Sequence, residues 1–548
     1  MFWDETTKQA LGWSDVWAQF QTVSKPGQRL RRGVRPFLPD ERAAWQESMQ
    51  DWQVARTFAF EDAKACRDAL VRVPDLAPVL NLIRQRAGVR VVDLFDVKTF
   101  LWQARDLQSR LEGVREPGFA WWPRLDWDAL LRLLNPRGEL VPAFSLQDLG
   151  DAVLDSLQEE ARRLEAAIFA AKKEQTDRLR AAFGKAPTRD GLVILEKKHA
   201  DLTHEDLRLQ GVNVFEAVFE VIEPEAVREM RAERERLLVE IEDREALVLE
   251  SIVTSLTPYA DDLENAYDAC GRLDWALAKA AVAQKWGACA AEWNECGVPR
   301  VEHNESRDTS DVLRSGWLLR TGWHPTARTG VESRGGVYTP LDMRLQPGVG
   351  LITGPNMGGK TVALKTLGLL QALAQHALPV PADEFRFEPV DRIGWSGGDE
   401  QSLVSGLSSF GAEMQRLAAL LREPTRALLL LDEVARTTNP QEGERLAVGL
   451  AQYLMTTAHS ALFASHFPGV TGVPGLQGFR VAGLRPDVWA KWESSQSSTP
   501  DPERLLAELQ QAMDYRLLPA ESQDVPQDAL RIARLFGLPE EIIRKEGP

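Results

Sequence analysis

The spacing of apolar residues predicts two long helices in the middle of the chain. From residue 145 to residue 183 there is no proline and, apart from Gly150, no glycine. Apolar residues recur there in steps of three and four, and a second such run follows Pro224. This period is typical of a coiled-coil seam, so the two runs predict an antiparallel helical arm. The seam positions are Leu157, Ala161, Leu164, Ile168 and Ala171 in the first run and Val227, Met230, Leu237, Ile241 and Val248 in the second, with Arg234 and Arg244 at interruptions.

Between the two helical runs, the apolar stretches 192–195 and 212–215 predict strands of a small tip domain. Basic residues gather around this tip, where they are suited to contact nucleic-acid phosphates. Glutamates share the arm and dilute the positive charge, so a solvated helix face of mixed charge is an equal alternative. The basic residues are Lys172, Lys173, Lys185, Arg189, Lys197 and Lys198.

The pattern differs on either side of the arm. Residues 1–145 read as helices broken by prolines, and nine of the 17 tryptophans precede Leu130. We interpret these tryptophans as core anchors between helices, rather than as a surface for stacking bases. Beyond about residue 311, short continuous apolar runs such as 349–353 and 427–431 predict buried strands of a parallel sheet.

One glycine-rich segment identifies a nucleotide site. Residues 354–361 fit the pattern G-x-x-x-x-G-K-[ST], and they lie between a predicted strand and a predicted helix. In this arrangement backbone N–H groups and the helix N-terminus cradle phosphates, Lys360 reaches the β- and γ-phosphates, and Thr361 binds Mg²⁺. The sequence therefore predicts binding of a nucleotide with Mg²⁺. The loop residues are Gly354, Pro355, Asn356, Met357, Gly358, Gly359, Lys360 and Thr361.

Polar residues at other predicted strand and helix ends complete this site. The aliphatic run 427–431 ends at Asp432 and Glu433. We expect Asp432 to hold Mg²⁺ and Glu433 to orient or deprotonate the attacking water. A later strand ends at His466, which could sense the γ-phosphate. Ser408 and Ser409 begin a helix and form a second possible anion site.

Composition limits the partners. The chain has 65 Lys and Arg against 81 Asp and Glu, a net charge of −16, which argues against indiscriminate binding of nucleic acid. The four cysteines show no C-x-x-C spacing, so a zinc site or a disulfide framework is not expected. Neither a secretory leader nor an apolar run of membrane-spanning length is visible. We expect a cytoplasmic protein with no membrane association.

The motifs together resemble MutS-family ATPases, in order and in spacing. The resemblance rests on the G-P-N-x-G-G-K form of residues 354–360, on 407–414, on 432–438 and on 463–466. It implies an ABC-type P-loop domain, a homodimer with composite ATP sites, and a nucleotide contact by Tyr338. In such a dimer Ser408 and Ser409 would cap the ATP of the second protomer. The resemblance also implies that the helical arm acts as a clamp around DNA.

Segments 399–402 and 439–443 resemble the branch of this family that lacks a mismatch-recognition domain. Two features depart from that branch. The Smr nuclease domain that often follows is not expected, because the sequence ends at Pro548. In addition, residues 434–439 replace a loop that usually carries glycines, which puts the communication between paired ATP sites in doubt.

We therefore expect an α/β P-loop ATPase domain at the C-terminus, preceded by a mostly helical core with a long antiparallel arm. The expected boundaries are 1–145 for a helical core, 146–260 for the arm, 261–310 for return helices and 311–548 for the ATPase domain. The first functional hypothesis is ATP-driven clamping of duplex, branched or mismatched DNA, as in DNA repair. The alternative is a reactivating factor for an adenosylcobalamin-dependent aminomutase, which would act on protein and not on DNA.

Overall fold

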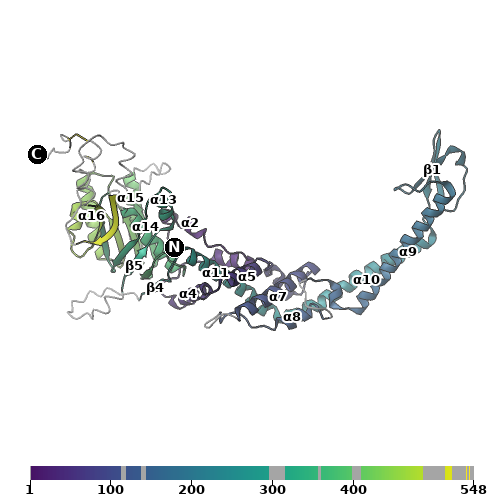
Figure 1. The fold of residues 1–548 in the computed structure, drawn as a ribbon, viewed down its shortest axis with the longest axis horizontal. Coiled ribbons are helices and arrows are strands. Elements are labelled where there is room, and N and C mark those ends of the chain that lie inside the picture. The colour runs from purple at the N-terminus through teal and green to yellow at the C-terminus, as the bar shows by residue number, and fades with distance from the viewer. Residues whose placement is uncertain are drawn as a thin grey trace.

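The computed structural model describes residues 2–112, 119–136, 143–294, 315–355, 359–397, 409–485 and 512–520, and the single positions 533, 538, 539 and 542. The molecule is elongated (Figure 1). A body built around β-sheets occupies one end, a helical region follows, and a pair of long helices extends to a small sheet at the other end. A helical N-terminal region followed by a mixed-sheet domain was expected and is confirmed.

The helical region is built around one long helix, α11 (Ala260–Trp286). Where 261–310 was expected to hold several return helices, its described part is this single helix and a short strand, β4 (Glu292–Trp293). Trp52 and Trp127 are buried in the cores of the molecule, which confirms that tryptophans anchor the packing. None of the described helices is both long and apolar enough to cross a membrane. The helices packed before the arm are α1 (Glu5–Ala10), α2 (Trp13–Trp17), α3 (Lys25–Gly33), α4 (Arg42–Arg56), α5 (Phe60–Val71), α6 (Ala77–Gln85), α7 (Val91–Leu111) and α8 (Trp127–Leu133).

The arm consists of α9 (Ala152–Phe183) and α10 (Glu225–Leu256), which pack against each other. Each helix has 32 residues, so each spans about 48 Å. The two arginines that interrupt the apolar seam have partners on the facing side of the arm. Arg244 lies 2.6 Å from Asp151 and Arg234 lies 3.5 Å from Glu165. The seam is thus continued across the helix pair by ion pairs.

The tip of the arm is a three-stranded antiparallel sheet of β1 (Leu192–Glu196), β3 (Glu216–Val221) and β2 (Leu207–Val212), in that order. The strand expected at 212–215 was wrong in its position, because β2 ends at Val212 and residues 213–215 form the turn of a hairpin. The side chain of Asn213 accepts hydrogen bonds from the N–H groups of Phe215 and Glu216, which fixes this turn.

Two sheets form the body at the other end of the molecule. The larger has six strands in the order β13-β12-β7-β11-β10-β9, parallel except for β13. The smaller has the order β4-β8-β5-β6. The strands are β5 (Trp317–Gly322), β6 (Leu341–Leu345), β7 (Val349–Thr353), β8 (Glu384–Phe387), β9 (Arg392–Gly397), β10 (Ala427–Asp432), β11 (Ser460–Ala464), β12 (Gln477–Leu484) and β13 (Met513–Pro519). The helices are α13 (Pro325–Glu332), α14 (Lys360–Gln375), α15 (Ser409–Arg422), α16 (Pro440–Met455) and α17 (Pro468–Thr471).

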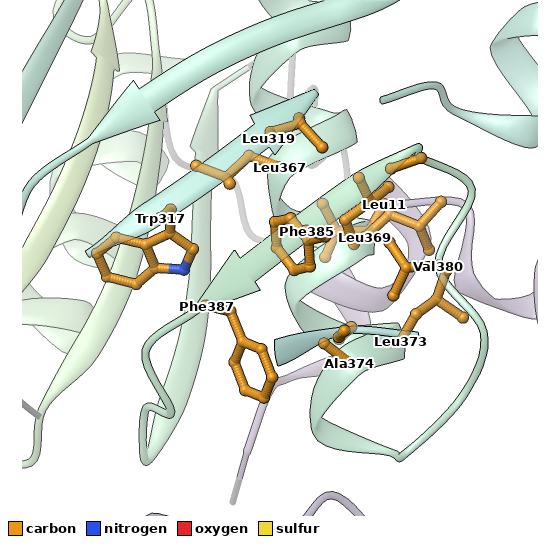
Figure 2. Packing of buried hydrophobic residues seen from close by; sticks show 14 of the residues in the cluster. Leu11, Trp317, Leu319, Leu367, Leu369, Leu373, Ala374, Val380, Phe385 and Phe387 are labelled. Atoms are coloured by element: carbon orange, nitrogen blue, oxygen red, sulfur yellow. The ribbon is translucent and has the colours of Figure 1, made fainter. Parts of the chain in front are cut away.

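Helix α14 lies in the core between these sheets, where its leucines meet aromatic side chains of the smaller sheet (Figure 2). Leu11, from the start of the chain, enters the same core. Hydrogen bonds also join the first residues to β9, because Ile393 N–H donates to Phe2 O at 2.8 Å and Trp395 N–H donates to Thr7 Oγ1 at 3.1 Å. The first part of the expected 1–145 unit therefore packs with the C-terminal body.

Asp274 ties this N-terminal segment to α11. Its buried carboxylate accepts hydrogen bonds from Val23 N–H at 2.9 Å, Ser24 N–H at 2.7 Å and Ser24 Oγ–H at 2.7 Å. Burial is the largest influence on this carboxyl group and raises its pKa. There is no room for another group beside it, since a Cβ added to Gly27 would lie 2.2 Å from Asp274 Oδ2.

We predict that Asp274→Ala lowers the free energy of unfolding by about 1–3 kcal/mol, because it leaves buried donors without an acceptor. Urea denaturation followed by circular dichroism measures this change. Asp268→Ala, on an exposed position of the same helix, is the matched control and should change stability by less than about 0.5 kcal/mol. Equal effects of the two substitutions would contradict the role of Asp274.

Candidate nucleotide site

The glycine loop joins a buried parallel strand to a helix, as the sequence predicts. All five residues of β7 are buried, and α14 begins at Lys360. Gly354 has a φ of +143°, and a Cβ there would lie 2.9 Å from Val481 Cβ. Gly359 caps α14 with a φ of +82°. Both positions thus require glycine, for conformation and, at Gly354, also for space. Asn356, Met357 and Gly358 lie outside the described residues.

The side chain of Lys360 is buried between the carbonyl groups of the glycine loop and the carboxylate of Glu433. Only 4% of its surface is exposed. Its Nζ donates to Gly354 O at 2.9 Å and to Pro355 O at 3.2 Å, and it lies 3.4 Å from Glu433 Oε1. The ammonium group therefore links the glycine loop to the end of β10, two strands away in the sheet.

Asp432 and Thr361 form the second link between the same two elements. Thr361 Oγ1–H donates to Asp432 Oδ2 at 2.7 Å. Among the described residues, the other oxygen, Oδ1, is buried without a hydrogen-bond partner. Burial is the main influence on this carboxyl group and raises its pKa. A hydroxyl beside a carboxylate with an unsatisfied oxygen fits a small hard cation such as Mg²⁺, which prefers oxygen ligands.

Glu433 follows in a strained conformation. Its φ is +50°, and that of Ala435 is +62°. A residue other than glycine with such a φ costs on the order of 1–3 kcal/mol and persists only where its surroundings hold it. Burial alone would raise the pKa of Glu433, but the hydrogen bond from Arg436, at 2.6 Å, and the charge of Lys360 outweigh burial and lower it. Glu433 is therefore ionised at neutral pH.

His466 lies two residues beyond the end of β11, exposed, with its ring centroid 4.4 Å from that of Phe467. Of the influences that lower the pKa of Glu433, His466 is the weakest. The strand expected to end at His466 ends at Ala464. A sequence pattern cannot fix such an end, because the last residues of a strand depend on their neighbours in the sheet.

The structure does not connect the remaining expected residues, Tyr338, Ser408 and Ser409, with this cluster of side chains. The Tyr338 hydroxyl accepts from His324 N–H at 3.2 Å. In the described residues, the hydrogen bonds that join Lys360, Thr361, Asp432 and Glu433 do not include Tyr338. Ser408 lies outside the described residues, and Ser409 begins α15, its side chain not described. Tyr338 lines a cavity of about 300 Å³ with Trp323, Arg328, Glu332, Gly336, Val337 and Pro340.

Sequence reasoning missed Tyr515, on β13. A Cβ added to Gly359 would lie 3.4 Å from Tyr515 Cδ1, so the phenol ring borders the glycine loop. Burial raises the pKa of Tyr515. An aromatic residue on an edge strand carries no local signal of such proximity, because the pairing of β13 beside β12 and β7 is a long-range property of the sheet.

Comparison with known proteins relates this chain to one protein family. Residues 350–546 match the family model described as MutS domain V. The protein named endonuclease MutS2 of Thermomicrobium roseum is 32% identical over 432 residues, which cover 76% of this chain and 48% of that protein. The endonuclease MutS2 of Streptococcus gordonii is 27% identical over 494 residues, covering 86% and 56%.

A third protein of the same name, from Streptococcus pneumoniae (strain ATCC 700669 / Spain 23F-1), is 26% identical over 450 residues, covering 75% of this chain and 51% of that protein. The chain thus spans about half the length of the curated relatives it matches. The match to domain V begins within β7 and takes in Lys360, Asp432 and Glu433. These matches support membership of the chain in the MutS family.

Proposed function

We propose that the chain is an ATPase of the MutS family, which binds ATP with Mg²⁺ at the carboxyl edge of its parallel sheet and hydrolyses it. The observation that carries this proposal is the meeting of Lys360, Thr361, Asp432 and Glu433 between the glycine loop and β10. Two acids, a buried lysine and a hydroxyl at a helix N-terminus are the groups that phosphoryl transfer from a nucleotide requires.

Each residue has a separate task in this proposal. When the nucleotide binds, Lys360 exchanges its hydrogen bonds to the carbonyl groups of Gly354 and Pro355 for contacts with β- and γ-phosphate oxygens. Thr361 and Asp432 hold Mg²⁺, which when bound neutralises charge on the phosphates. Glu433, ionised and held by Arg436, orients and deprotonates the attacking water. His466, two residues beyond the end of β11, contacts the γ-phosphate.

Two tyrosines are suited to contact the base of the nucleotide. Tyr338, for which the family resemblance implies a nucleotide contact, lines a cavity beside α13, and Tyr515 borders Gly359. An aromatic face next to a phosphate-binding loop is suited to stacking on a purine base. We assign both residues to nucleotide binding.

The N-terminus of α15 supplies the case for a homodimer. Ser409 begins a 14-residue helix, whose dipole favours an anion at this end, and Ser408 precedes it in the sequence. We propose that they cap the ATP of a second protomer, so that two composite sites form across a two-fold axis.

The target of the arm is the second part of the proposal. Matches to proteins named endonuclease MutS2 favour DNA, duplex or branched, held by the basic residues of the tip. The tip itself weakens this case, because Lys172 lies 3.1 Å from Glu223, and Lys198 lies 2.8 Å from Glu196. The hairpin turn also exposes 72% of Val214 and 80% of Phe215. These apolar residues favour the alternative, a protein partner such as a cobalamin-dependent aminomutase.

Glu433→Gln should lower kcat for ATP hydrolysis by about 10²–10⁴-fold, since it removes the proposed base. ATP should still bind. Lys360→Ala should weaken both binding and turnover, because it removes the cation that faces the phosphates. Steady-state phosphate release and equilibrium binding of a fluorescent ATP analogue measure the two effects. Glu442→Gln, the same substitution at an exposed position of α16, is the control. Wild-type turnover in Glu433→Gln would show that the base is another residue.

Mixing two inactive variants tests the composite site. Lys360→Ala chains and Ser408→Ala/Ser409→Ala chains should each hydrolyse ATP poorly as homodimers. In a mixed dimer, one site carries both defects and the other carries neither, so mixing should restore activity. Native mass spectrometry verifies subunit exchange. Proven exchange without any recovered hydrolysis would contradict the composite site.

Reversing Lys172, Lys173, Lys197 and Lys198 to glutamate should weaken binding to all duplex sequences alike. The log–log dependence of affinity on salt should become less steep by roughly one unit for each DNA phosphate that a lysine no longer neutralises. Fluorescence anisotropy with labelled duplex at several salt concentrations measures this, with basal ATP hydrolysis as the control for folding. A wild-type chain without affinity for DNA at low salt would instead favour the protein partner.

A further inference from the structure

The loop that follows Glu433 is held in a conformation that it would not keep by itself. Ala435 is fully buried with a φ of +62°, in the region that favours glycine, and Glu433 before it has a φ of +50°. Such residues persist only where surrounding contacts fix them. The contacts of Ala435 therefore help to decide where the carboxylate of Glu433 lies.

Ala435 is held from two sides by two helices. Its N–H donates to Glu413 Oε1, on α15, at 3.0 Å. Its carbonyl group faces α16, where a Cβ added to Gly443 would lie 2.7 Å from Ala435 O. The same added Cβ would lie 2.9 Å from Phe467 Cζ, so α16 has no room to move closer. On the α16 side, Ala435 is supported by close backbone packing at Gly443. On the α15 side, its support is one hydrogen bond to the carboxylate of Glu413.

We propose that Glu413 is a positioning residue for the hydrolytic reaction, which fixes Glu433 through the N–H group of Ala435. Glu413 stands about one helical turn beyond Ser409, the first residue of α15. A shift of α15 would therefore move the acceptor of Ala435 and, with it, the carboxylate of Glu433. The position of α15, the helix proposed above to cap the ATP of a second protomer, would in this way set the position of the carboxylate of Glu433 in the chain's own site. The inference rests on the proposed ATPase function.

Four variants test this inference. Glu413→Ala removes the acceptor, whereas Glu413→Gln keeps an oxygen at the same place. Ala435→Gly allows the left-handed conformation without a side-chain clash. The double variant Glu413→Ala/Ala435→Gly asks whether that freedom compensates for the missing acceptor. Gln415→Ala, at an exposed position of α15, controls for changes in the helix itself.

Glu413→Ala should lower kcat by about 10²-fold, the scale of a misplacement near 1 Å, while the KM for ATP stays unchanged. Glu413→Gln should keep wild-type kcat, and the double variant should recover part of the loss. Wild-type kcat in Glu413→Ala would overturn the proposal. So would joint loss of ATP binding and turnover that Glu413→Gln fails to restore, or a double variant without recovery.

Hydrogen exchange separates this inference from the proposed function. Amides of residues 433–437 should exchange faster in Glu413→Ala than in the wild type, whether or not the chain hydrolyses ATP. A wild-type chain without hydrolysis would refute the ATPase, and the exchange rates would still report on the Glu413 contact. Unchanged exchange in Glu413→Ala would overturn the positioning role on its own.

Discussion

The structure of the site depends on the burial of opposite charges at one edge of a parallel sheet. Lys360 and Asp432 are almost removed from solvent, and neither would be stable there alone. Lys360 is held by loop carbonyl groups and by Glu433, while Asp432 receives the hydroxyl hydrogen of Thr361. One oxygen of Asp432 is left unsatisfied within the described residues. The site thus offers a cation, Lys360, to phosphate oxygens and this carboxylate oxygen, on Asp432, to a metal ion. This pair of groups is the basis of the proposed activity.

The far end of the helix that begins at Lys360 is joined to the helical region. Trp45 Nε1–H donates to Ala374 O at 2.6 Å, and Phe37 N–H donates to Gln375 O at 2.6 Å. Lys279, on α11, is buried nearby, with its Nζ 3.4 Å from Ala377 O and its pKa lowered by burial to about 7. Because α11 continues from the region where α10 ends, α14 is connected through packed elements to the arm.

Much of this organisation could be predicted from sequence, wherever a local pattern determines the structure. The strand at 349–353, the strand that carries Asp432, and both arm helices have strong periodicity or a motif with strict spacing. The hairpin turn at 213–215 was misread as a strand because its apolar residues, Val214 and Phe215, are exposed instead of buried. Tyr515 gave no usable signal, and Glu413 was noted only as part of the motif at 407–414, because the contacts of both residues join segments distant in sequence.

The most direct test of the account is the dependence of ATP binding on Mg²⁺, measured by isothermal titration calorimetry with wild-type chain and with Asp432→Ala. We predict that wild-type chain binds ATP more tightly in Mg²⁺ than in EDTA, and that Asp432→Ala loses most of this difference. Wild-type chain that binds no ATP in Mg²⁺, or an Asp432→Ala variant with the full Mg²⁺ dependence, would contradict the assignment of the site.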